Sequence, residues 1–246
     1  MKVAALYDIH GNLPALEAVL KEIEQLDVKE IVVGGDVVLG PMSNECLDRL
    51  LSIKIPAHFI QGNCEAAILS ELAGNQTENL PERVLKNIQW TANELRPSHE
   101  KIISGWPEKI ILEIDGLGKV LFCHATPRSK TENFTRLTPV NKLKEIFEEI
   151  NEPYVVCGHT HMQFEKKVGN VRILNAGSIG MPFGKPGAYW LLLGTKVEFR
   201  YTAYNIKKAS EVLMKSKYPD AEDFALNNLI NPPSEELMLK VLSNGN

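Results

Sequence analysis

The feature that most constrains the fold is an alternation of strand and helix patterns over the first sixty residues. Strand patterns at 2–7, 30–33 and 57–60 are separated by two amphipathic stretches, one from about Leu13 and one over about 43–53. This βαβαβ order predicts three parallel strands joined by right-handed crossovers. In the first amphipathic stretch, apolar residues recur at helical spacing, and Asn12 is a candidate N-cap.

The rest of the chain divides into a helical segment, a strand-rich half and a helical tail. Residues 64 to about 105 are predicted to be helical, and the tail from 206 is helical with breaks at Pro219 and Pro232-Pro233. A helix is expected at 139–150, and strands at 109–114, 119–123, 153–157, 163–168, 171–174, 188–193 and 196–204. We therefore expect an α/β fold of two packed sheets with helices outside. It forms a single domain over 1–246, with a core of about 1–205 and a tail of about 206–246.

Polar side chains with metal-binding capacity follow the predicted strands. Because the carboxyl ends of parallel strands meet at one edge of a sheet, these side chains could share one cleft although they span some 150 residues. The donors are Asp8, His10, Asp36, Asn63, His124, His159 and His161.

Carboxylates, imidazoles and an amide oxygen suit manganese, iron, zinc, nickel or cobalt better than calcium. Taken singly, each donor has an ordinary structural explanation. Asp8 could cap a helix, His10 or His124 could be a hydrogen-bonded core histidine, and Asn63 could be a turn residue. Their joint occurrence at strand ends favours a metal centre, in which Asp36 could bridge two ions.

The order D-x-H, G-D, G-N, H and G-H-x-H resembles the calcineurin-like metallophosphoesterase superfamily over residues 1 to about 200. The segments DIHGN, GNCE and NAGSIGMP resemble its small bacterial and archaeal phosphodiesterase-type branch. The resemblance implies a four-layer α-β-β-α sandwich. It also implies ligands for a first metal (Asp8, His10, His161), ligands for a second metal (Asn63, His124, His159) and a bridging carboxylate (Asp36).

The resemblance further implies attack on a phosphate ester by a hydroxide that bridges two divalent ions, with manganese first among the metals. Asp36, Asn63 and His124 are then the expected catalytic residues, and a phosphodiester is the expected substrate. Asn12 resembles a position that lines the substrate phosphate. Arg128 is a candidate phosphate contact, with a solvated loop charge as its alternative. A phosphomonoesterase, a dinucleoside polyphosphate hydrolase and a metal-binding scaffold with little turnover are the alternative functions.

Cys64 departs from the pattern of the superfamily. Many relatives have a histidine beside the metal-binding asparagine, which helps to protonate the leaving oxygen, and a thiol is a weak donor. The sequence favours a packing role for Cys64 over a chemical one.

Composition limits the partners. The 246 residues carry a net charge of −4, so the chain offers no basic field for nucleic acid. No apolar stretch reaches the roughly 20 residues of a membrane span, and no leader pattern is visible, so we expect a cytoplasmic protein with reduced thiols. The expected partner is a small phosphate ester whose size is set by residues 64–108 and the tail, and a homo-oligomer is left open.

Overall fold

The protein is described here from a computed structural model that covers residues 1–75 and 80–244. Two five-stranded sheets face each other, with the strand orders β10-β9-β1-β2-β3 (sheet A) and β4-β5-β6-β8-β7 (sheet B). The strands are β1 Val3–Leu6, β2 Glu30–Val33, β3 Ala57–Phe59, β4 Lys109–Ile114, β5 Gly118–Cys123, β6 Tyr154–Cys157, β7 Gln163–Val168, β8 Val171–Ala176, β9 Ala188–Leu193 and β10 Val197–Thr202.

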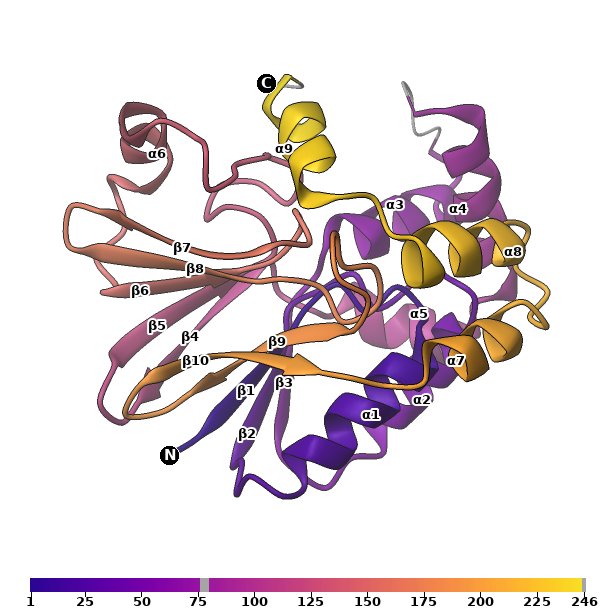
Figure 1. The fold of residues 1–246 in the computed structure, drawn as a ribbon, viewed down its shortest axis with the longest axis horizontal. Helices are drawn as coiled ribbons and strands as arrows, with labels where there is room; N and C mark the ends of the chain where they lie inside the picture. The colour runs from indigo at the N-terminus through magenta and orange to yellow at the C-terminus, as the bar shows by residue number, and fades with distance from the viewer. Residues whose placement is uncertain (76–79, 245–246) are drawn as a thin grey trace.

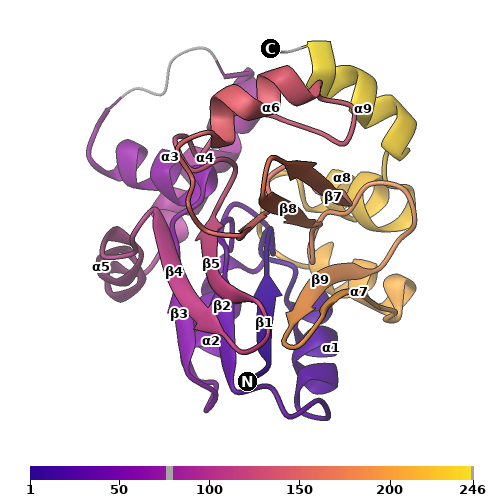
Figure 2. The ribbon, with the colours of Figure 1, turned by 90° about the vertical axis from the view of Figure 1, so that its left-hand side faces the viewer.

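Helices cover the outer faces of both sheets. They are α1 Leu13–Ile23, α2 Ser43–Leu51, α3 Asn63–Leu72, α4 Glu82–Glu94, α5 Pro97–Ser104, α6 Val140–Phe147, α7 Ile206–Leu213, α8 Ala221–Phe224 with its π-helical continuation Ala225–Ile230, and α9 Glu235–Asn244. In Figure 1, α1 and α2 lie on one side of the paired sheets and α6 on the other, and Figure 2 shows α6 and α9 together at one end of the view. The predicted four-layer α-β-β-α sandwich is confirmed.

Sheet A begins with the predicted parallel unit. β1 pairs with β2 and β2 with β3, all in parallel, while β9 pairs antiparallel with β1. All four residues of β1 are buried, because both faces of this sheet are covered. Val3 and Ala5 face the core between the sheets, whereas Ala4 and Leu6 face the core under the outer helices.

The short connections of the second half also form as predicted. β4 and β5 make an antiparallel hairpin around Gly116, and β7 and β8 make another around Gly169, both glycines having a positive φ. Positive φ is costly for residues with a Cβ, which explains glycine at these turns.

The tail is helical and has its own apolar cluster. Leu213, Tyr218 and Phe224 are buried there, with Trp90 of α4 and Met181 packed against them. The chain breaks at the predicted prolines, so α7 ends before Pro219 and α9 begins after Pro232-Pro233. None of the helices in the described parts of the chain has the length and apolar character needed to span a membrane.

Candidate metal centre

The seven predicted donors gather at one edge of the two sheets. Asp8, Asp36 and Asn63 follow the three parallel strands of sheet A, and His124 and His159 follow β5 and β6 of sheet B. They form two groups that meet at Asp36. We call Asp8, His10 and His161 the first donor group, and Asp36, His124, His159 and Asn63 the second.

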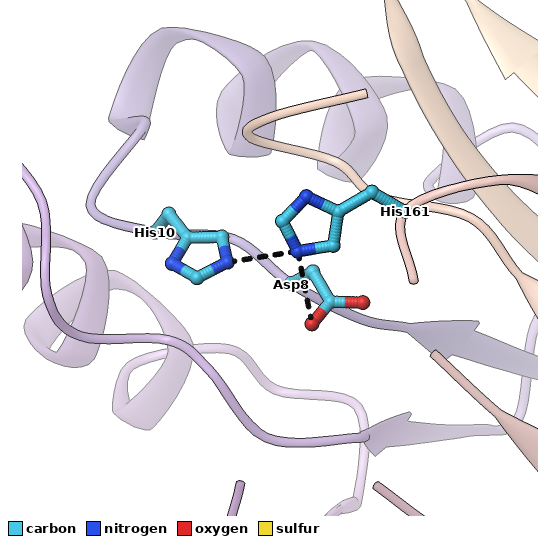
Figure 3. A group of neighbouring side chains, drawn as sticks. All are labelled: Asp8, His10 and His161. Carbon is cyan, nitrogen blue, oxygen red and sulfur yellow. Dashed lines mark hydrogen bonds and ion pairs between the residues drawn. The ribbon is translucent and has the colours of Figure 1, made fainter. Parts of the chain in front are cut away.

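In the first donor group, three side chains converge on a small volume (Figure 3). The Nε2 atoms of His10 and His161 are 3.1 Å apart, and His161 Nε2 lies 3.6 Å from Asp8 Oδ1. Their ligand atoms all lie within 4.8 Å of one another.

In the second donor group, His124 Nε2 lies 2.9 Å from Asn63 Oδ1 and 3.5 Å from Asp36 Oδ2. The same Asp36 oxygen lies 3.8 Å from His10 Nε2, which belongs to the first group. Asp36 therefore occupies the position between the two groups that a bridging carboxylate needs.

The hydrogen bonds behind the histidines fit metal ligation. His161 Nδ1 lies 2.8 Å from the carbonyl of Met181, and His124 Nδ1 lies 2.9 Å from the carbonyl of Gly34. A carbonyl accepts only, so each Nδ1 donates its proton, and each Nε2 would present a lone pair to an ion once the ring is neutral. Asp8 Oδ1 is buried and has no hydrogen-bond partner among the described residues. A buried carboxylate oxygen without a partner is costly, and a divalent cation would satisfy it.

Charge is balanced by protonation in the metal-free centre. Burial lowers the pKa of His10 and His159 to about 4. Burial also opposes a charged His124, but the carboxylates of Asp36 and Asp8 outweigh it and raise the pKa of His124 to about 10. His124 in turn holds the pKa of Asp36 well below its usual range despite burial. A bound cation would take the place of this imidazolium proton, so metal binding should release protons.

The backbone turns sharply at the donors. Five of the seven have a positive φ, between 48° and 67°: Asp8, His10, Asp36, His159 and His161. This left-handed conformation explains how both members of the D-x-H and H-x-H pairs reach the same cluster. Glycines make room for the carboxylates, since a Cβ at Gly62 would lie 2.2 Å from Asp36 Oδ1 and one at Gly158 would lie 2.4 Å from Asp8 Oδ2.

Glu65 is a residue that the sequence analysis missed. Its buried carboxylate accepts hydrogen bonds from the backbone N–H groups of Asp36, Val37 and Gly62, each at 2.8 Å, and from Val38 at 3.2 Å. Because Glu65 lies at the start of α3, these hydrogen bonds attach the loop that contains Asp36 to this helix. The signal was present, because Glu65 stands three residues after Gly62, the N-cap of α3, which is the spacing of Glu in a capping box.

Two more residues support the cluster from behind. Ser178 Oγ donates to the carbonyl of Asp8 at 2.8 Å, which ties the NAGSIGMP segment to the first donor group. Tyr7 lies between β1 and Asp8. Its hydroxyl donates to the carbonyl of Val156 at 3.1 Å, and its ring fills the space that a Cβ at Gly34 would occupy. Tyr7 therefore packs behind the centre.

The two predicted substrate contacts have internal partners. Asn12 is fully buried: Oδ1 caps α1 by accepting from Ala15 N at 3.1 Å, and Nδ2 donates to Gly180 O and Tyr204 Oη. This confirms the predicted N-cap. Arg128 is exposed and bonds to Glu132 and to the carbonyl of Glu145. The structure does not bring Arg128 into either donor group, and its contact with phosphate stays a prediction.

A cavity of about 340 Å³ opens beside His10. One wall comes from α4, with Arg83, Val84 and Asn87, and the opposite wall comes from the tail, with Tyr218, Asp220, Asp223, Phe224 and Asn228. Arg83 bonds to Asp220 at 2.6 Å and to Asp223, so its charge is engaged across the cavity. The helical segment and the tail, which were expected to set substrate size, thus both line a space next to the donor groups.

Comparison with known proteins agrees with the geometry. The sequence profile of the calcineurin-like phosphoesterase superfamily domain matches residues 1–197. An uncharacterised protein of Methanocaldococcus jannaschii (MJ0912) is 28% identical over 238 residues, covering 89% of this chain and 94% of the relative. Phosphodiesterase YfcE of Escherichia coli K12 is 25% identical over 202 residues, covering 78% and 87%.

Solved structures share the fold. The hypothetical protein PH1004 of Pyrococcus horikoshii OT3 superposes with a TM-score of 0.80 at 19% identity, covering 95% of this chain and 99% of the other. A metallophosphoesterase of Sphaerobacter thermophilus superposes with a TM-score of 0.72 at 22% identity, covering 92% and 97%. With the family profile matched over most of its length, the chain belongs to the calcineurin-like phosphoesterase superfamily.

Proposed function

We propose that the protein is a metal-dependent phosphodiesterase in which the two donor groups hold two divalent ions. The observation that carries the proposal is the meeting of seven donors from both sheets, with Asp36 between the two groups. Ions bound there would supply Lewis-acid activation of the attacking water and would offset the negative charge of the phosphate.

The chain's own residues hold and orient this chemistry. His161 and His124 are fixed in the ligating tautomer by the carbonyls of Met181 and Gly34. Asn63 presents its amide oxygen beside His124, and Glu65 fixes the loop that positions Asp36. Gly62 and Gly158 leave room for the carboxylates of Asp36 and Asp8, because a Cβ at either glycine would clash with them.

The cavity beside His10 supports a diester over a monoester. Its volume of about 340 Å³ suits an organic ester group. Arg83, the cation in its lining, is paired with two aspartates, so the wall is acidic overall. A phosphomonoester dianion would be repelled more than a diester monoanion. The likeness to an Escherichia coli phosphodiesterase supports the same substrate class.

The test is hydrolysis of bis-p-nitrophenyl phosphate and p-nitrophenyl phosphate by metal-depleted protein to which manganese, iron, zinc, nickel or cobalt ions are restored one at a time. We expect EDTA to abolish turnover, a divalent ion to restore it, and the diester to be preferred. His161→Ala should lose activity. His99→Ala is the control, because His99 is a buried histidine that bonds instead to Asn44 and Asp48 of α2. Undiminished turnover in a verified metal-free sample would contradict the proposal, as would metal binding without hydrolysis of any ester.

A further inference from the structure

Cys64 makes polar contacts with Asp36 in addition to its apolar packing. Its sulfur is 3.1 Å from Asp36 Oδ2, and its backbone N–H donates to Asp36 Oδ1 at 2.8 Å. Cys64 therefore contacts both oxygens of the carboxylate that lies between the two donor groups. The residue is 4% exposed, so water does not compete for these contacts.

The sulfur also completes a third set of donors. Cys64 Sγ, Asp36 and His10 offer ligand atoms that all lie within 4.8 Å of one another. Of the four cysteines, Cys64 is the one whose sulfur lies among these donors, although Cys46, Cys123 and Cys157 are buried as well. His10 faces the same space through Nε2, which lies 3.8 Å from Asp36 Oδ2.

Apolar packing alone does not account for this arrangement. Cys64 joins the same apolar cluster as Cys46, under the helices that cover sheet A. An alanine or valine could fill that volume, but neither would reach the carboxylate of Asp36. The position thus combines burial with a soft donor directed at two metal-ligand candidates.

We propose that Cys64 is a metal ligand of the centre, binding as a thiolate an ion that it shares with His10 and Asp36. On binding, the S–H bond breaks, the proton leaves to solvent, and a sulfur electron pair forms the bond to the cation. A thiolate favours zinc, cobalt or ferrous iron over manganese, so this position of the centre should select a softer ion than its carboxylate and imidazole donors alone would. The inference rests on the proposed metal centre but does not depend on turnover.

The first measurement needs no variant. X-ray absorption at the zinc edge, on full-length protein loaded with one zinc equivalent, should show a sulfur scatterer at about 2.3 Å together with nitrogen and oxygen. A shell of nitrogen and oxygen alone would overturn the proposal. Because this readout is structural, it remains informative if no ester is hydrolysed.

The second measurement uses a matched pair of variants. Metal-depleted wild-type protein titrated with cobalt(II) under anaerobic conditions should develop a near-ultraviolet band from charge transfer between thiolate and metal. Cys64→Ser should lose the band, and its preference for zinc over manganese in a competition measured by elemental analysis should fall at least about tenfold. Cys46→Ser, at a buried helical cysteine of the same apolar cluster, should keep both properties.

The outcomes separate this proposal from the proposed function. Hydrolysis that requires metal, without a sulfur signal, would overturn the thiolate ligand and leave the phosphodiesterase intact. A sulfur signal without hydrolysis would support the thiolate ligand and contradict the phosphodiesterase. If Cys64→Ser fails to fold by circular dichroism, the zinc-edge spectrum of the wild-type protein decides.

Discussion

At the scale of single residues, Asp36 is the side chain that lies between the two donor groups. Replacing it with asparagine keeps the acceptor for the Cys64 backbone N–H but removes the charge shared between His10 and His124. We predict that Asp36→Asn lowers kcat/KM by about 10³-fold or more and reduces bound metal below that of His10→Ala. The measurements are steady-state kinetics and elemental analysis.

The matched control for Asp36→Asn is Asp27→Asn. Asp27 has nearly the same positive φ, 52° against 53°, but it lies on the exposed loop before β2. Normal rate and metal content in the Asp36 variant would refute the bridging assignment.

Glu65 is predicted to act through structure. Glutamine has one acceptor oxygen, and its NH₂ group would face backbone N–H groups that now share a carboxylate. Glu65→Gln should therefore lower the free energy of unfolding by about 3 kcal/mol, measured by urea denaturation. Glu71→Gln, on the same helix and partly exposed, should change it by less than about 0.5 kcal/mol. Equal stability of the two variants would contradict the role of the Glu65 carboxylate.

The donor set could be predicted from sequence because seven such side chains occur together at strand ends, although each of them alone has an ordinary structural explanation. The contacts that these and neighbouring side chains make in the folded protein were harder to predict from the sequence. Arg128 was weighed as a phosphate contact, but the structure pairs it with Glu132, which lies four residues further along the chain. Cys64 was assigned to packing, because nothing in the local pattern shows that its sulfur approaches Asp36, 28 residues earlier.

At the scale of elements, the tail and α4 enclose the cavity beside His10. Tyr218 contributes a buried ring to its wall and packs edge-on against Trp90, with ring centroids 5.4 Å apart. We predict that Tyr218→Ala raises KM for diesters with a bulky ester group by about tenfold, because the group loses an apolar contact. The kcat for bis-p-nitrophenyl phosphate and the metal content should remain.

Tyr154→Ala is the control for Tyr218→Ala, since Tyr154 lies on β6 and bonds to Arg172, away from the cavity. A similar KM for large and small diesters in the Tyr218 variant would show that the substrate does not enter this space.

Local sequence patterns predicted the helices and strands well, but they did not predict which strands distant in the sequence pair with one another. The parallel unit β1-β2-β3 followed from the alternation of strand and helix, and Glu30–Val33 forms as predicted. The neighbour of β1 on its other side is β9, and the pair Val3 and Leu193 joins residues at opposite ends of the core. Sequence periodicity carries no information on which distant segments meet. For this reason neither the pairing of β1 with β9 nor the contact between the tail and α4 could be predicted.

At the scale of the whole molecule, the centre joins the two sheets. Donors of sheet A and donors of sheet B must come together for an ion to bind, so binding should stabilise the folded state of both layers. At an ion concentration of one hundred times Kd, the expected gain is about 2.7 kcal/mol. We predict that EDTA lowers Tm and that the divalent ion restores it, measured by calorimetry.

The same calorimetric experiment on His161→Ala should give a smaller gain in Tm, because one ligand of the first donor group is missing. A wild-type Tm that does not change with added ion at saturating concentration would argue against ligands shared between the sheets.

The left-handed backbone at five donors has a further consequence, which concerns the history of the sequence. A residue with a Cβ in this conformation costs about 1–2 kcal/mol, and glycine would relieve that cost. A lineage with no use for metal would gain stability from such replacements, so mutation and drift should turn these positions into glycines. The aspartates and histidines at these five positions therefore cost the fold stability, and the proposed metal centre gives a reason for their presence.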